Sequence, residues 1–289
     1  MRYTEKTAYG KINLGLDVTG RRDDGYHLLK MIMQSVGIYD TLTFSKNDSP
    51  DILIATNRDY LPTGPKNLIY RAVDLIREEY GIKDGISINL EKGIPVAAGM
   101  AGGSADAAVA ILAMNEMFEL GMDPDRMSSL GLRLGADIPF CIRGGTCLAE
   151  GIGEKLTSLP AMPDCSILII KPGFGISTKY VYQAIDEISI PDHPDIDGIA
   201  EALRNGDISR ICAAMGNVLE LVSCREHPGI EKIKDSMRTM GADAAMMTGS
   251  GPAVFGIFTD AGKAEKAFGY FKKSEYQNGT FLTKPVAKY

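Results

Sequence analysis

The chain of 289 residues has little of what metal, nucleic-acid or membrane binding requires. It contains three histidines, and its five cysteines form no CxxC pair, so the usual ligands of a zinc site are scattered. A net charge of -6 provides no basic surface for nucleic acid or anionic lipid. No apolar run approaches the roughly 20 residues that span a bilayer, and the charged opening MRYTEKTAYGKINLGLDV is unlike a signal peptide. We therefore expect a cytoplasmic protein with reduced thiols, no named metal ligand, and no nucleic-acid or membrane partner.

What the chain does contain is typical of a globular protein, with 45% hydrophobic and 24% charged residues. Alternating or buried apolar runs predict strands at 7–20, 85–93, 165–173, 244–249, 252–260 and 279–285. Helical spacing predicts helices at 67–81, 104–120, 125–135, 178–188, 195–206, 229–241 and 263–273. This irregular order favours an α+β fold over a doubly wound parallel sheet. Two prolines in KLTSLPAMPD place a boundary near 155–163, and hence two domains at 1–160 and 161–289.

The stretch PVAAGMAGGSADAAVAILAMNEMF, residues 95–118, places small residues directly before a predicted helix that begins at Ser104. Small residues allow a backbone to approach an anion, and a helix start offers unpaired N–H groups, so this stretch suits a polyphosphate. It lacks the lysine of a Walker motif and the glycine spacing of a dinucleotide fingerprint. By itself it is equally consistent with a tight turn that packs a strand against an alanine-rich helix.

Two further segments indicate what this stretch does. PVAAGMAGGSADAA resembles the phosphate-binding motif of the GHMP small-molecule kinases, AYGKINLGLDVTGRRDDGYH resembles their first motif, and MMTGSGPAVFGIF resembles their third. The resemblance implies a two-domain architecture, with an N-terminal domain like domain 2 of ribosomal protein S5 and a ferredoxin-like C-terminal domain. It also implies ATP with Mg²⁺, and a nucleotide site formed by Pro95, Val96, Ala97, Ala98, Gly99, Met100, Ala101, Gly102, Gly103, Ser104 and Ala105.

The residues of the second motif differ slightly from those most common in the family. Alanines replace glycines at 97 and 98, methionine replaces leucine at 100, and alanine replaces serine at 105. Because an alanine with positive φ is penalised, we expect the strained backbone positions at Gly99, Gly102 and Gly103. Ser104, at the head of the helix, is a candidate for capping it or for contacting phosphate or magnesium.

The loop GRRDDGYH narrows the range of substrates that we expect. It resembles the branch of the family that phosphorylates the 2-hydroxyl of diphosphocytidyl methylerythritol, a small-molecule substrate of isoprenoid precursor synthesis outside the mevalonate route. Another small-alcohol kinase of the same family is the alternative within enzymes. A non-catalytic nucleotide-binding protein is the alternative outside them, although such a protein would need neither Lys11 nor Asp137. We expect a monomer or a weak homodimer.

The resemblance also implies roles for individual residues. Asp137 takes the position of the catalytic base, and Lys11 that of the lysine which keeps this carboxylate ionised and stabilises developing charge. A capping aspartate and a solvated strand lysine are the structural alternatives. His27 and an aromatic ring, Tyr26 or Tyr182, would hold the cytosine, with helix packing an equal alternative for Tyr182. The full set of substrate candidates is Asn13, Tyr26, His27, Thr178, Tyr182, Gly249, Ser250 and Gly251.

Overall fold

The protein is described here by a computed structural model covering residues 3–287. The described chain divides into two compact units. The first comprises residues 3–10, 38–96 and 101–143, and the second comprises 11–37, 97–100 and 144–287. The long strands β1 (Tyr3–Arg21) and β2 (His27–Asn47) therefore contribute residues to both units. The domain boundary near residue 160 stays a prediction.

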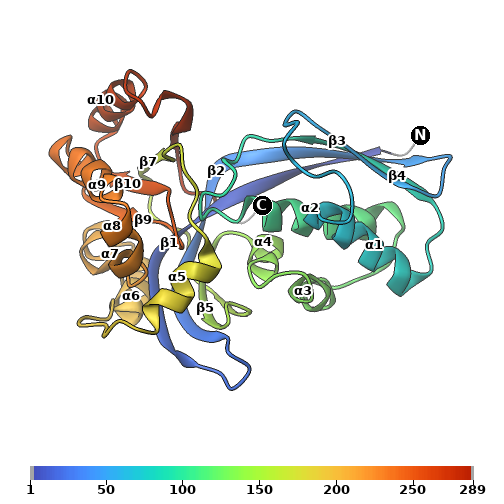
Figure 1. Cartoon of the computed structure of the whole chain (residues 1–289), viewed down its shortest axis with the longest axis horizontal. Coiled ribbons are helices and arrows are strands. Elements are labelled where there is room, and N and C mark those ends of the chain that lie inside the picture. The colour runs from blue at the N-terminus through green and yellow to red at the C-terminus, as the bar shows by residue number, and fades with distance from the viewer. Residues whose placement is uncertain (1–2, 288–289) are drawn as a thin grey trace. The chain divides into compact units, whose positions relative to one another are not determined.

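The first unit is a sheet portion covered by helices. In it, β4 (Gly85–Glu91) pairs antiparallel with the second half of β2 and parallel with β3 (Ile52–Thr56). Figure 1 shows the helices lying together on one side of these strands. They are α1 (Leu68–Tyr80), α2 (Gly102–Met117), α3 (Pro124–Leu132) and α4 (Ile138–Arg143).

Local signals in the sequence account for the ends of α1. Asn67 caps its start, where the side-chain oxygen accepts a hydrogen bond from the N–H of Ile69 at 2.8 Å. Gly81 ends the helix in the left-handed conformation, with φ 66°. Between these residues the apolar positions fall on one buried face, as the predicted helix over 67–81 requires.

The second unit contains two groups of strands. Around the remaining parts of β1 and β2, β5 (Thr146–Gly151) pairs with β2 and with β6 (Lys155–Ser158), and β8 (Gly216–Asn217) pairs parallel with β1. A separate antiparallel sheet has the order β11 (Thr280–Thr283), β7 (Ser166–Ile170), β10 (Val254–Phe258), β9 (Ala244–Met247). The helices are α5 (Thr178–Ile185), α6 (Ile196–Asn205), α7 (Ile208–Ala214), α8 (Glu220–Glu226), α9 (Gly229–Thr239) and α10 (Ala261–Phe271), with a 3-10 turn at Gln277–Gly279.

The predicted α+β class is confirmed, and the predicted strands and helices correspond to elements of the structure. The sequence analysis missed β2, β3, α4, β5, β6, α7, β8 and α8. Residues 31–36 of β2 are buried continuously, so this part of the strand lacks alternation, and α7 and α8 have only seven residues each. Within residues 3–287, no helix has the length and apolar character needed to cross a bilayer.

Candidate active site

The first motif places a lysine and an asparagine on one face of β1. Lys11 and Asn13 are two residues apart in the strand, and both are buried, with exposed fractions of 5% and 0%. The ammonium of Lys11 donates a hydrogen bond of 2.6 Å to Oδ1 of Asn13. Within the described part of the second unit, no carboxylate forms an ion pair with Lys11. A buried ammonium with a neutral partner favours an anionic ligand.

Parts of the second and third motifs meet beside Lys11. Its backbone N–H donates to the carbonyl of Met100 at 3.1 Å, and the hydroxyl of Thr248 lies 3.1 Å from the N of Asn13 and 3.4 Å from the O of Gly99. A Cβ added to Gly99 would lie 2.3 Å from the carbonyl oxygen of Thr248, so only glycine fits there. A Cβ on Gly249 would lie 3.1 Å from the oxygen of Gly99 and 3.6 Å from Nζ of Lys11. The second unit thus brings residues of all three motifs together.

The strained positions of the glycine-rich stretch differ from the prediction. Gly99 has the expected positive φ, 75°, but Gly102 and Gly103 do not, and Ala97 (52°) and Ala101 (56°) do. The prediction was wrong for Gly102 and Gly103 because α2 begins at Gly102, two residues earlier than expected, and places both in helical backbone. A positive φ in a non-glycine residue costs of the order of 1–3 kcal/mol, so the surrounding structure must hold the two alanines in place.

The N-terminus of α2 has no side-chain cap. Ala101 occupies the cap position, where it cannot accept a hydrogen bond, and Ser104 lies inside the helix, so the capping role considered for Ser104 is wrong. The first N–H groups of this 16-residue helix are therefore available to an anion, in the direction favoured by the helix dipole. With only alanine and glycine at 101–103, these residues fit a polyphosphate such as that of ATP.

Gly102→Val is expected to weaken ATP binding by about tenfold or more, because the side chain would occupy space at this helix start. A Cβ there would lie 3.1 Å from Cγ2 of Ile94 and 3.3 Å from Nζ of Lys92, so these neighbours would have to shift. Nucleotide and substrate affinities would be measured by calorimetry, with Gly103→Ala as the control because a Cβ at 103 meets only Leu68, at 3.5 Å. Equal loss of both affinities, or an unfolded protein, would favour the packing-turn interpretation.

A buried ionic network lies beside the start of α2. Nζ of Lys92 donates to Asp106, at 2.8 Å, and to Asp40, and all three side chains are at most 5% exposed. Asp40 also accepts from the N–H groups of Gly93 and Ile94 at 2.7 and 2.8 Å. Burial raises the pKa of Asp106, whose Oδ1 has no hydrogen-bond partner among the described residues. The sequence analysis missed this network because its members are far apart in the chain and each resembles a surface residue.

His27 and Tyr182, both substrate candidates, lie together in the second unit. Their ring centroids are 5.1 Å apart, and Nε2 of His27 lies 2.6 Å from a carboxylate oxygen of Asp186, a residue that the sequence analysis missed. Tyr26 is 60% exposed. Two other substrate candidates, Thr178 and Ser250, have their hydroxyl oxygens 2.8 Å apart. Four of the predicted substrate residues therefore lie in two pairs, His27 with Tyr182 and Thr178 with Ser250, whereas Asn13 and Gly249 lie beside Lys11.

Asp137 lies in the first unit, immediately before α4. Its carbonyl accepts a hydrogen bond from the N–H of Cys141 at 3.1 Å, and the residue is half-buried.

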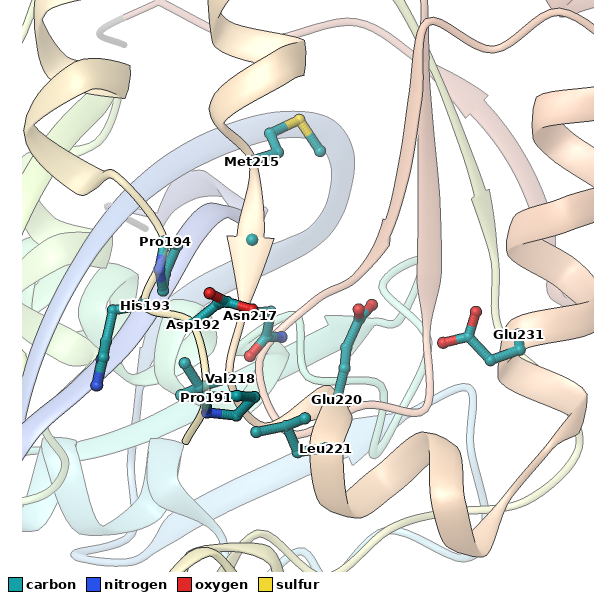
Figure 2. Close-up of a pocket in the computed structure, with 11 residues that line it drawn as sticks. Pro191, Asp192, His193, Pro194, Met215, Asn217, Val218, Glu220, Leu221 and Glu231 are labelled. Carbon is teal, nitrogen blue, oxygen red and sulfur yellow. The ribbon is translucent and has the colours of Figure 1, made fainter. Parts of the chain in front are cut away.

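The second unit also contains a cavity of about 440 Å³. It is lined by Pro191, Asp192, His193, Pro194, Met215, Gly216, Asn217, Val218, Glu220, Leu221 and Glu231. Figure 2 shows Glu220 and Glu231 on neighbouring helices beside it. Glu220, Cys224 and Glu231 lie close enough to hold a metal ion, but the ammonium of Lys234 donates to both glutamates, at 2.7 and 2.8 Å. Because this cation already compensates the carboxylates, the cluster is better described as an ion-pair network.

Two family models match the chain. The GHMP kinases N terminal domain matches residues 67–145, and the GHMP kinases C terminal domain matches residues 199–277. The chain is 47% identical over 277 residues to a 4-diphosphocytidyl-2-C-methyl-D-erythritol kinase of Lachnoclostridium phytofermentans, covering 96% of this chain and 95% of the relative. It is 51% identical over 253 residues to the kinase of the same name from Lachnospira eligens, covering 88% of each.

Solved structures give a similar result. A crystal structure of 4-(cytidine 5'-diphospho)-2C-methyl-D-erythritol kinase superposes with a TM-score of 0.81 at 30% identity, covering 98% of this chain and 100% of the other. Homoserine kinase from Cytophaga hutchinsonii superposes with a TM-score of 0.78, covering 100% and 96%, at 20% identity, which shows the shared fold alone.

Proposed function

This chain belongs to the GHMP kinase family, and from that premise we propose how its residues carry out phosphoryl transfer from ATP. It is an ATP-dependent kinase whose substrate is 4-diphosphocytidyl-2-C-methyl-D-erythritol, in isoprenoid precursor synthesis. The acceptor that we propose is the 2-hydroxyl of the erythritol unit, so that the products are the 2-phosphate and ADP. The observation that supports this proposal most is the convergence of three motif segments around the buried Lys11.

We assign Lys11 to charge stabilisation. Its ammonium is buried, is held by Asn13, and lies beside the backbones of Gly99 and Gly249. A fixed cation in a water-poor site stabilises the negative charge that develops during phosphoryl transfer, without needing to reorganise. The glycines allow the backbone on either side to approach closely.

We assign Asp137 to the general base that takes the proton of the attacking hydroxyl. A half-buried carboxylate, with its backbone fixed at the start of α4, has the chemistry that this step requires. The uncapped start of α2 would hold the nucleotide phosphates through its N–H groups. Mg²⁺ bound to the nucleotide would neutralise phosphate charge. Most of its ligands would be water and phosphate oxygens.

We assign recognition of the cytosine to His27 and Tyr182. Asp186 accepts from Nε2 of His27 if that nitrogen carries the proton, which leaves Nδ1 as an acceptor for the base. The ring of Tyr182, already beside that imidazole, provides an apolar face for stacking, and the exposed ring of Tyr26 is available for the opposite face.

Tyr182→Ala is expected to raise KM for the diphosphocytidyl substrate by about 10- to 100-fold, since a base stack contributes about 1–3 kcal/mol. The KM for ATP should change less than about twofold, because no nucleotide contact is removed. The control is Tyr180→Ala on the same helix, where the hydroxyl donates to Glu226 and the residue is 45% exposed. An unchanged substrate KM in Tyr182→Ala would leave this tyrosine with the packing role alone.

The remaining expectations stay predictions. They are Mg²⁺ as the accompanying ion, a cytoplasmic location, a monomer or weak homodimer, and the absence of nucleic-acid and membrane partners. The individual residues of the nucleotide and substrate sites also stay predictions until they are tested by substitution.

A further inference from the structure

Side chains of residues 217–223 in the second unit form hydrogen bonds to the backbone of the third motif. Asn217, in β8, donates from Nδ2 to two carbonyls, those of Met247 at 2.9 Å and Gly249 at 2.8 Å. Glu220, at the start of α8, accepts from the N–H of Met247 at 2.7 Å. Ser223, one turn later, donates to the carbonyl of Ser250 at 3.1 Å. Three side chains spaced three residues apart thus make four hydrogen bonds to the backbone of 247–250.

These side chains are themselves fixed. Asn217 and Ser223 are 7% and 1% exposed, and Oδ1 of Asn217 accepts from the N–H of Leu219 at 3.0 Å, which sets the orientation of the amide. The second oxygen of Glu220 accepts from Lys234. Figure 2 shows Asn217 on β8 and Glu220 on the first turn of α8, along one wall of the cavity. Buried side-chain donors and acceptors of this kind add to the backbone hydrogen bonds that Met247 and Thr248 make with β10 and Ala253, and so fix the turn further.

The turn held in this way is the one that contacts Lys11. Thr248 bonds the backbone N–H of Asn13, and Gly249 lies so near Lys11 that a Cβ there would be 3.6 Å from the ammonium. Any shift of 247–250 would therefore move the backbone that confines Lys11. His27 and Tyr182 lie in a different cluster, where their rings are 5.1 Å apart and His27 contacts Asp186.

We propose that Asn217, Glu220 and Ser223 are positioning residues for phosphoryl transfer, which hold the third motif so that Lys11 is correctly placed. This inference rests on the proposed role of Lys11. Displacement of a catalytic group by about 1 Å can reduce turnover by around 100-fold, so loss of these bonds should lower kcat more than it raises KM.

The first test is Asn217→Leu, which keeps the branched shape of the side chain and removes both N–H donations from Nδ2. We expect kcat to fall by about 10- to 100-fold, with KM for the diphosphocytidyl substrate within about threefold of wild type. The comparison is Met237→Ala, a buried residue of α9, with both proteins assayed well below their melting temperatures. An unchanged kcat in Asn217→Leu, or an equal loss of kcat in Met237→Ala, would overturn the inference.

The second test does not depend on Asn217→Leu folding. Glu220→Gln keeps an acceptor for the N–H of Met247, whereas Glu220→Leu does not, so Glu220→Gln should retain most of kcat and Glu220→Leu should lose it. Glu231→Leu removes the other partner of Lys234 without touching 247–250 and should behave like wild type. Equal kcat in Glu220→Gln and Glu220→Leu would contradict the proposal.

Lys11→Met separates this inference from the function on which it rests. Loss of turnover in Lys11→Met together with normal kcat in Asn217→Leu would overturn the positioning role alone. Normal turnover in Lys11→Met would overturn the role of Lys11 as well.

Discussion

Asp137→Asn is expected to lower turnover by at least about 100-fold, the usual scale for the loss of a general base. Asparagine has nearly the same shape as aspartate, and the hydrogen bond between Asp137 and the N–H of Cys141 is made by the backbone carbonyl of Asp137, so the fold and the affinity for ATP should change little. The measurement is single-turnover phosphorylation with saturating nucleotide, together with nucleotide binding by calorimetry.

The matched control for this variant is Asp123→Asn. Asp123 caps α3 through its side chain, which accepts a hydrogen bond from the N–H of Arg126 at 2.7 Å. It therefore serves as an example of an aspartate with a capping role alone, the structural alternative considered for Asp137. Substitution there should affect stability by at most about 1 kcal/mol and leave turnover unchanged. Turnover near the wild-type rate in Asp137→Asn would remove Asp137 from the mechanism.

Removal of the cytidylyl group from the substrate is expected to reduce kcat/KM by several orders of magnitude. A base stack contributes about 1–3 kcal/mol, and a polar group left unpaired in the site costs a comparable amount, so together they correspond to about a 10²- to 10⁴-fold effect. Binding energy from this remote group can orient the hydroxyl toward the γ-phosphate, so kcat should fall as well as affinity.

The comparison is between 4-diphosphocytidyl-2-C-methyl-D-erythritol and methylerythritol 4-phosphate, both with wild-type protein and with Tyr182→Ala. In the variant the difference between the two compounds should shrink, because part of the recognition has been removed. If the truncated alcohol is phosphorylated with about the same efficiency by wild-type protein, the roles given to His27, Tyr26 and Tyr182 are wrong.

Local signals in the sequence predicted many of the elements. Helix α1 is an example, since the Asn67 cap, the apolar periodicity and Gly81 are all encoded within a few residues of one another. The start of α2 was placed two residues late because Ser104 resembles a cap, while the structure uses Ala101 in the left-handed conformation. That conformation depends on packing around the loop, and residue preference alone favours glycine there.

Candidate site residues could be named from the sequence where a motif identifies them, as for Lys11, Asn13 and Gly99, and their roles stay predictions. Asp186, Asn217 and Lys92 were missed, because each acquires its role from a partner distant in the chain. Asp186 meets His27 across 159 positions, and Asn217 meets Gly249 across 32. A lone asparagine or aspartate in a sequence carries no sign of such a partner, so these contacts follow only from the tertiary structure.

The most direct test of the central claim is a coupled assay of ADP release with three alcohols. The purified protein would be supplied with ATP and Mg²⁺ and with 4-diphosphocytidyl-2-C-methyl-D-erythritol, homoserine or mevalonate in turn, with Asp137→Asn as the background. The account predicts ADP release with the diphosphocytidyl compound at a kcat/KM at least about 1,000-fold above that with either of the other two, because those lack the base. Comparable rates with homoserine or mevalonate, or no release with the diphosphocytidyl compound, would contradict it.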